Sequence, residues 1–133
     1  MSYLYWLISL IGRGCMAAIF VTSGIEKILM WEQTLDYMSS HGLPFVEILL
    51  FLAAAIEVFA GLALFLGIKR HLAATLLALY LIPVTYVFHN FWMISDPAMQ
   101  MVEYINFMKN LAIFGGLVCL AVPAKKETAQ PKK

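Results

Sequence analysis

Four long apolar runs, separated by short polar breaks, dominate this 133-residue chain. Each run holds about 20 to 26 residues, enough for a helix to cross a hydrocarbon core of about 30 Å. Because 62% of the residues are hydrophobic and 13% are charged, a soluble fold of this length would leave too much apolar surface in water. The sequence therefore predicts an all-α integral membrane four-helix bundle over residues 1–123. Its expected spans are residues 4–29, 45–67, 72–92 and 103–122.

The placement of basic residues predicts the side of the membrane on which each end lies. With both ends in the cytoplasm, the Lys69-Arg70 turn lies inside, together with the lysines of the tail 124–133. The two opposite loops carry acidic residues and contain neither Lys nor Arg. This asymmetry follows the positive-inside rule and predicts an N-in/C-in multi-pass protein. The tail, rich in Lys, Gln and Pro, is expected to be disordered and cytoplasmic.

Two smaller features complete the predicted fold. The loop Met30–Leu43 is long enough for a short amphipathic helix, whose Leu35 and Met38 are expected to rest on the outer end of the bundle. Cys15 and Cys119 lie in apolar runs without a CxxC motif, so we expect two small core residues rather than a thiol-redox or zinc site.

Ionisable side chains inside the apolar runs are costly at membrane depth and usually face the interior of a bundle. Arg13, Gly24 and Lys27 share one face of the first predicted helix by their spacing. Glu57 lies between Ala54 and Gly61 on a small-residue face of the second. Counting the helical rise places Arg13 and Glu57 near the same depth. We therefore expect these two residues to form an ion pair.

The polar residues of the spans form a predicted column from the middle of the membrane toward the outside. This column is either a structural network that fixes helix register or a ligand or proton site. Its three basic side chains outnumber its one carboxylate, which favours an anionic or carbonyl-bearing ligand. No spacing matches a metal motif, and no catalytic residue is assigned. The candidate residues are Arg13, Lys27, Glu57, His89, Asn90, Lys109 and Asn110.

Six short motifs, in order, resemble the DoxX family of small four-helix membrane proteins. After Arg13 they are Phe20–Lys27, Gly42–Pro44, Ala54–Gly61, Gly67–Arg70, Phe88–Trp92 and Lys109–Ala112. The resemblance implies a bacterial inner membrane protein. The family takes its name from a subunit associated with thiosulfate:quinone oxidoreductase, and other members are linked to redox homeostasis or act as membrane chaperones. Since neither cysteine is expected at an exposed position, the sequence does not favour a thiosulfate-linked activity for this chain.

Two functional hypotheses follow. In the first, the chain is a redox-linked subunit that binds a quinone or similar small ligand, being at most one subunit of a membrane oxidoreductase with a membrane or periplasmic redox partner. In the second, it is a non-enzymatic scaffold or chaperone whose buried charges are structural. No cofactor motif is evident, and quinone is the candidate left open. The lipid bilayer is the expected partner, and assembly into a homo-oligomer is possible. The net charge of +1 gives no indication of nucleic-acid binding.

Overall fold

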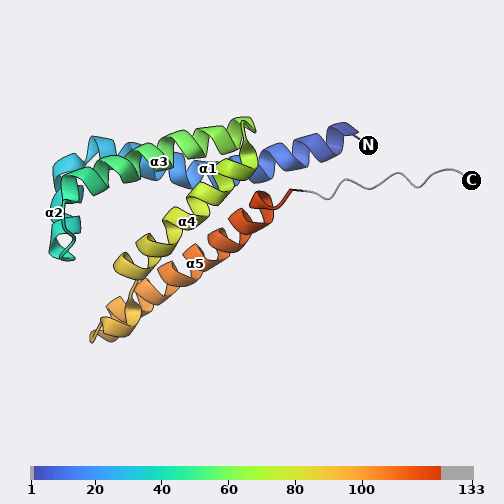
Figure 1. Ribbon diagram of the computed structural model, residues 1–133. Coiled ribbons are helices and arrows are strands. Elements are labelled where there is room, and N and C mark those ends of the chain that lie inside the picture. The colour runs from blue at the N-terminus through green and yellow to red at the C-terminus, as the bar shows by residue number, and fades with distance from the viewer. Residues whose placement is uncertain (1, 124–133) are drawn as a thin grey trace, which may run out of the picture.

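The computed structural model describes residues 2–123 and consists of helices and loops, with no strand in this range (Figure 1). Four of its helices are long and apolar enough to cross a membrane, which confirms the predicted all-α membrane fold. The predicted tail 124–133 lies outside the described residues. The elements are α1 (Ser2–Leu29), α2 (Trp31–Ser40), α3 (Val46–Leu66), α4 (Arg70–Phe88), the 3₁₀ helix η1 (Phe91–Met93) and α5 (Pro97–Ala121).

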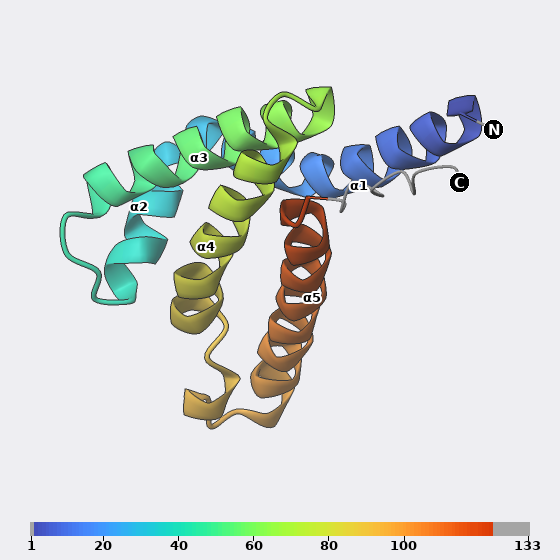
Figure 2. The same cartoon turned by 45° about the vertical axis from the view of Figure 1, so that its right-hand side comes forward.

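The four long helices form two pairs. α1 packs along α3, and α4 packs along α5, while α3 and α4 also contact each other. The pairs diverge from the α3–α4 turn, and the N-terminal half of α1 extends beyond the other helices (Figure 1, Figure 2). α5 makes few contacts with α1, and in one of them the Met16 side chain lies against Gly116. The bundle is therefore held together mostly by the α1–α3, α3–α4 and α4–α5 contacts.

Two glycines allow α1 and α3 to approach closely. A β-carbon at Gly24 would lie 2.7 Å from Cγ2 of Val58, and one at Gly61 would lie 2.8 Å from Cγ2 of Val21. Small residues at such crossings let helix backbones pack tightly in a membrane. This contact fixes the face of α3 that carries Glu57 against α1.

The short helix α2 lies at the end of the molecule opposite the α3–α4 turn, which we call the α2 end (Figure 2). Its Met38 is buried, as predicted. The Tyr37 ring stacks on Phe88 of α4 with a centroid separation of 5.5 Å. α2 therefore bridges the two diverging helix pairs.

The helix α5 begins six residues earlier than the hydropathy pattern predicts. Asp96 is its N-cap, and the carboxylate accepts a hydrogen bond of 2.8 Å from the Met99 amide. Pro97 occupies the first helical position, where its missing N–H costs nothing. Asp96-Pro97, which lies before the predicted span 103–122, is thus a helix start.

The expected burial of the cysteines is wrong. Cys15 and Cys119 are both exposed on the helix surface. α1 and α5 bury only narrow faces, so an apolar run does not by itself place a small residue in the core. Burial therefore does not exclude a reactive thiol at either position, although both cysteines lie inside candidate membrane spans.

Candidate ligand site between the helix pairs

A buried carboxylate lies at the contact between α1 and α3. The Glu57 residue is 4% exposed. Nζ of Lys27 lies 2.9 Å from its Oε2 and donates to its Oε1 at 3.1 Å. The Ser23 hydroxyl lies 3.3 Å from the same Oε1 and also accepts a hydrogen bond of 2.7 Å from Lys27. Ser23 and Lys27 reach Glu57 together because residues four apart share one face of a helix.

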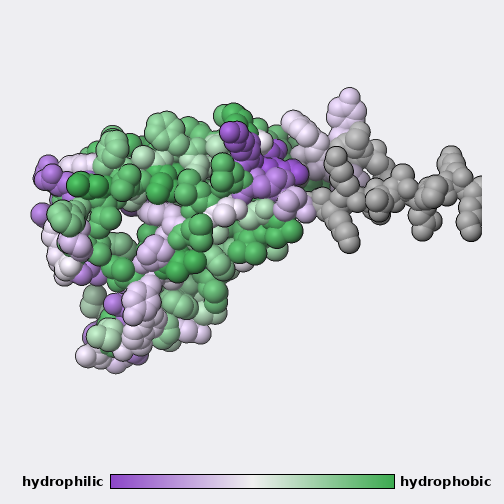
Figure 3. Space-filling view, viewed as in Figure 1, coloured by the Kyte–Doolittle hydropathy of each residue, from purple (hydrophilic) through white to green (hydrophobic). Residues whose placement is uncertain are grey.

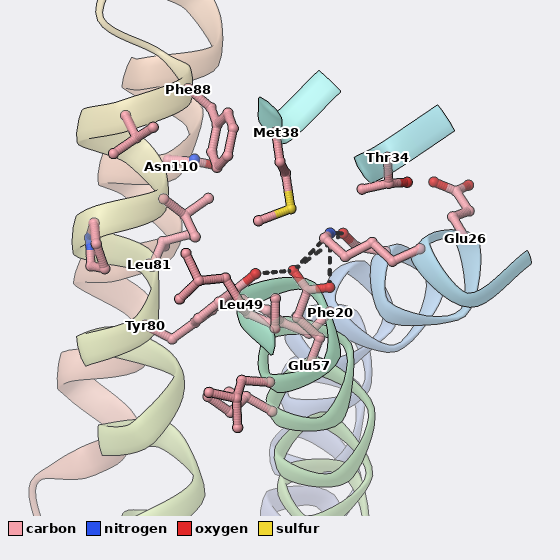
Figure 4. Close-up of a pocket in the computed structure, with 18 of the residues that line it drawn as sticks. Phe20, Glu26, Thr34, Met38, Leu49, Glu57, Tyr80, Leu81, Phe88 and Asn110 are labelled. Carbon is pink, nitrogen blue, oxygen red and sulfur yellow. Dashed lines mark hydrogen bonds and ion pairs between the residues drawn. The ribbon is translucent and has the colours of Figure 1, made fainter. Parts of the chain in front are cut away.

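A fourth side chain arrives from the other helix pair. The Tyr80 hydroxyl of α4 donates a hydrogen bond of 2.8 Å to Oε1 of Glu57 (Figure 4). We call Ser23, Lys27, Glu57 and Tyr80 the Glu57 cluster. Within it, Oε1 accepts several hydrogen bonds, whereas Oε2 accepts none from any described residue and has only the ionic contact with Lys27. Within residues 2–123, the buried Oε2 atom thus has Lys27 as its only partner.

A cavity of about 660 Å³ adjoins the Glu57 cluster. This volume lies in the range of about 300–1,000 Å³ that holds small molecules and cofactors. Its walls are mainly apolar, with Phe20, Leu49, Leu81 and Phe88 among them (Figure 4). In the space-filling view a hollow opens between α3 and α4 beside α2 (Figure 3). We call this cavity the chamber. A mainly apolar cavity with a few polar groups is typical of sites that bind small amphipathic ligands.

The α4–α5 wall of this cavity carries a second set of polar contacts. Nδ1 of His89 lies 2.6 Å from Oε2 of Glu103, and Nδ2 of Asn110 donates a hydrogen bond of 3.0 Å to the Thr85 hydroxyl. Pro83 also lines the cavity, and its ring removes the amide that would otherwise bond to the carbonyl of Leu79. Polar groups therefore face the chamber from both helix pairs.

The structure brings together part of the predicted column. Lys27, Glu57, His89 and Asn110 all line the cavity. Lys109 is exposed on α5 and does not belong to the cavity lining. Asn90 precedes η1, where its carbonyl accepts a hydrogen bond of 2.9 Å from the Met93 amide.

The predicted ion pair between Arg13 and Glu57 is wrong, because Lys27 pairs with Glu57 instead. The Arg13 guanidinium lies against Gly67, at the α3–α4 turn. Gly67 is about 15 Å along α3 from Glu57 at the helical rise. Arg13 and Glu57 do not lie at the same depth, contrary to the prediction from the helical rise, because α1 extends beyond α3 at its N-terminal end (Figure 1).

Sequence reasoning missed Ser23 and Tyr80. The spacing of Ser23 from Lys27 was a usable signal, since a hydroxyl four residues before a buried lysine lies on the same face. Tyr80 could have been suspected because it lies within an apolar run, and a buried tyrosine hydroxyl normally has a hydrogen-bond partner. Neither signal identifies the carboxylate that the side chain contacts.

Together, the fold and the site define a multi-pass helical membrane protein with an open chamber between its helix pairs and a buried polar cluster beside it. A family model described as DoxX matches residues 8–90, so the chain belongs to the DoxX family. It is 30% identical over 113 residues to the inner membrane protein YphA of Escherichia coli (strain K12), covering 85% of this chain and 80% of that protein.

A second relative from the same organism is the inner membrane protein YqjF. It is 33% identical over 113 residues, which cover 85% of this chain and 81% of that protein. No solved structure matches the chain. The names of the relatives and the four apolar helices agree that this is an inner membrane protein.

Proposed function

We propose that this DoxX-family protein binds a quinone or a closely similar small amphipathic ligand in the chamber, as a redox-linked subunit of a membrane complex. The observation that carries the proposal is the position of the Glu57 cluster beside an apolar cavity of about 660 Å³. An apolar ring and tail suit the walls, and polar ring oxygens suit the cluster.

The cluster offers complementary partners to both redox forms of such a ligand. A quinone oxygen is an acceptor, and Lys27 and Tyr80 are the nearby donors. A quinol hydroxyl is a donor, and Oε2 of Glu57 is a buried acceptor whose only contact, in the part of the chain that the structure describes, is with Lys27. The cationic ammonium would also stabilise negative charge that develops on a quinone oxygen. Under this proposal the electrons come from a membrane or periplasmic redox partner.

The N-in/C-in topology is part of the same proposal. It places the α3–α4 turn, with Lys69 and Arg70, on the cytoplasmic side and the α2 end toward the periplasm. His89 and Glu103, which lie near the α2 end, would then stand between the chamber and the outer aqueous phase. Such a pair can exchange protons with a bound ligand.

A titration with a short-chain quinone, in protein reconstituted into lipid nanodiscs, tests the binding step. Tryptophan fluorescence supplies the signal, and Trp31 lies at the start of α2, whose Thr34 and Met38 line the chamber. We expect saturable quenching in the wild type and about tenfold weaker binding in Glu57→Gln, a loss of about 1.4 kcal/mol. The matched control is Glu47→Gln, since Glu47 is exposed on the first turn of α3.

The scaffold hypothesis makes the opposite prediction. If the Glu57 cluster is only structural, quinone gives no saturable response, or Glu57→Gln binds as tightly as the wild type. A folded Lys27→Glu, Glu57→Lys double variant sharpens the comparison because it keeps an opposite-charge pair while moving the acceptor. Quinone binding should be lost in this variant, whereas a scaffold would keep its partner.

A further inference from the structure

A second buried charge lies away from the chamber and has no carboxylate partner. The Arg13 residue is 8% exposed. Its Nε donates a hydrogen bond of 3.3 Å to the Ser9 carbonyl of its own helix. No carboxylate among residues 2–123 lies within ion-pair distance of the guanidinium. Its terminal nitrogens are not among the fully buried unpaired atoms, so a group from outside the chain can reach them. An anion would compensate this charge, which has lost most of its water.

The guanidinium faces the α3–α4 turn. Its Nη1 occupies the space that a β-carbon of residue 67 would need, so that any side chain there would collide with it. Gly67 also ends α3 in the left-handed conformation, with φ of 76°. The terminal nitrogens of Arg13 are therefore held beside the backbone of the turn and form no hydrogen bond to a described residue.

The turn itself is arranged to receive an anion. Helix α4 starts after Lys69 without a side-chain cap and has no acidic residue in its first turn. The Lys69 carbonyl accepts from the Ala73 amide, so the preceding amides of the first turn have no partner within the helix. Lys69 and Arg70 are exposed cations at the same place. Figure 3 shows a strongly hydrophilic patch over this turn, bordered by apolar surface.

The apolar border indicates what kind of molecule carries the anion. Leu66, Ile68 and Leu72 flank the turn, and each is more than half exposed. A phosphate would interact with the cations and the helix N-terminus. Acyl chains would cover the flanking leucine and isoleucine side chains. Basic recesses between membrane helices bind phospholipid headgroups in this manner.

We propose that the α3–α4 turn is a binding site for the phosphate of an anionic phospholipid, with Arg13 as the buried contact and Lys69 and Arg70 as the exposed ones. The site is separate from the chamber and does not depend on quinone binding. The competing explanation is that the dipole at the C-terminus of α3 alone stabilises Arg13. That explanation requires no lipid preference.

Lipid retention by wild-type protein tests the proposal. The protein is reconstituted in phosphatidylcholine nanodiscs with or without phosphatidylglycerol, and the melting temperature and the co-purified lipid are measured. We expect phosphatidylglycerol to raise the melting temperature and to be retained in preference to phosphatidylcholine. Retention should be about tenfold weaker in Arg13→Gln. Lys109→Gln, which removes an exposed lysine on α5, should behave as the wild type.

A second variant and a phosphate titration separate a lipid site from a folding defect and from a free-phosphate site. Since Arg13→Gln can fail to fold, the double variant Lys69→Gln, Arg70→Gln changes only exposed residues and should also weaken retention severalfold. Inorganic phosphate added to phosphatidylcholine nanodiscs separates the sources of the anion: stabilisation by phosphate alone supports the same site with a free ion. Equal melting temperatures in both lipids, with no effect of phosphate, would overturn the proposal.

Discussion

The Tyr80 hydroxyl and Oε1 of Glu57 lie 2.8 Å apart, and their hydrogen bond joins the α4–α5 pair to the α1–α3 pair. Lys27 reaches the same carboxylate from α1. One side chain therefore receives contacts from two neighbouring helices where the pairs begin to diverge around the chamber. Changes at this carboxylate should affect both helix packing and the chamber.

Removing the Tyr80 hydroxyl should weaken the contact between the helix pairs. Tyr80→Phe keeps the ring but deletes a hydrogen bond to a charged group, which contributes about 1–2 kcal/mol in a membrane protein. The free energy of unfolding in detergent micelles should fall by that amount. Tyr86→Phe is the control, because Tyr86 is exposed on α4. Equal losses in both variants would contradict an ordered hydrogen bond at Tyr80.

The Lys27–Glu57 pair should show strong coupling in a double-mutant cycle. Lys27→Met alone leaves a buried carboxylate without its cation and should cost about 3 kcal/mol of unfolding free energy. The double variant Lys27→Met, Glu57→Leu removes both charges and should recover to within about 1 kcal/mol of the wild type. Additive losses in the cycle would show that the two side chains do not interact.

Gly24 should tolerate no larger residue. In Gly24→Ala the new β-carbon would lie 3.0 Å from Cβ of Glu57 and 3.2 Å from the Ala54 carbonyl oxygen, and neither atom can rotate away. We expect a loss of about 1–3 kcal/mol in unfolding free energy. Gly12→Ala in the same helix meets nothing within 4 Å. It should be neutral or stabilising by up to about 1 kcal/mol.

The start of α5 should depend on the Asp96 cap. Asp96→Ala removes the acceptor of the Met99 amide and should cost about 1 kcal/mol. Hydrogen exchange at Met99 and Gln100 should accelerate, while exchange near Leu117 stays unchanged. Asp96→Asn can still accept the hydrogen bond and should restore protection. If exchange in Asp96→Ala matches the wild type, the cap does not hold the first turn.

The Tyr37 phenol on α2 should titrate above the usual range. Partial burial of this half-exposed side chain, with a smaller contribution from the Glu103 charge, raises the pKa of Tyr37 above 10.0. The folded state therefore favours the neutral phenol, and the packing of α2 is fully stable below pH 10 and weakens as the pH rises through the raised pKa. Glu103→Gln should lower the pKa of Tyr37. Absorbance titration of the wild type minus Tyr37→Phe measures it, and a pKa at or below 10 would contradict the packing described.

The fold was largely predictable because span length and hydropathy are local properties of the sequence. The four membrane helices and the short helix with Met38 follow from them. The start of α5 was missed for a specific reason. Hydropathy weights Asp96 as a loop residue, whereas its capping role depends on the direction of one side chain toward the Met99 amide.

The site was predictable only in part. Glu57 and Lys27 could be identified because each lies on a face with small residues. Their pairing could not, because the choice between Lys27 and Arg13 depends on how far α1 is displaced along α3, which periodicity does not encode. The contribution of Tyr80 likewise depends on the angle between the helix pairs.

The hollow between α3 and α4 opens between the sides of two membrane helices, beside α2 (Figure 3). Under the proposed binding role, a ligand would enter from within the lipid. Occupancy would then follow the mole fraction of ligand in the bilayer, and its total concentration in the sample would matter only through partitioning. Adding empty lipid vesicles at constant total ligand should therefore lower the occupancy of the chamber. Affinities from different preparations become comparable only after normalisation to the amount of lipid.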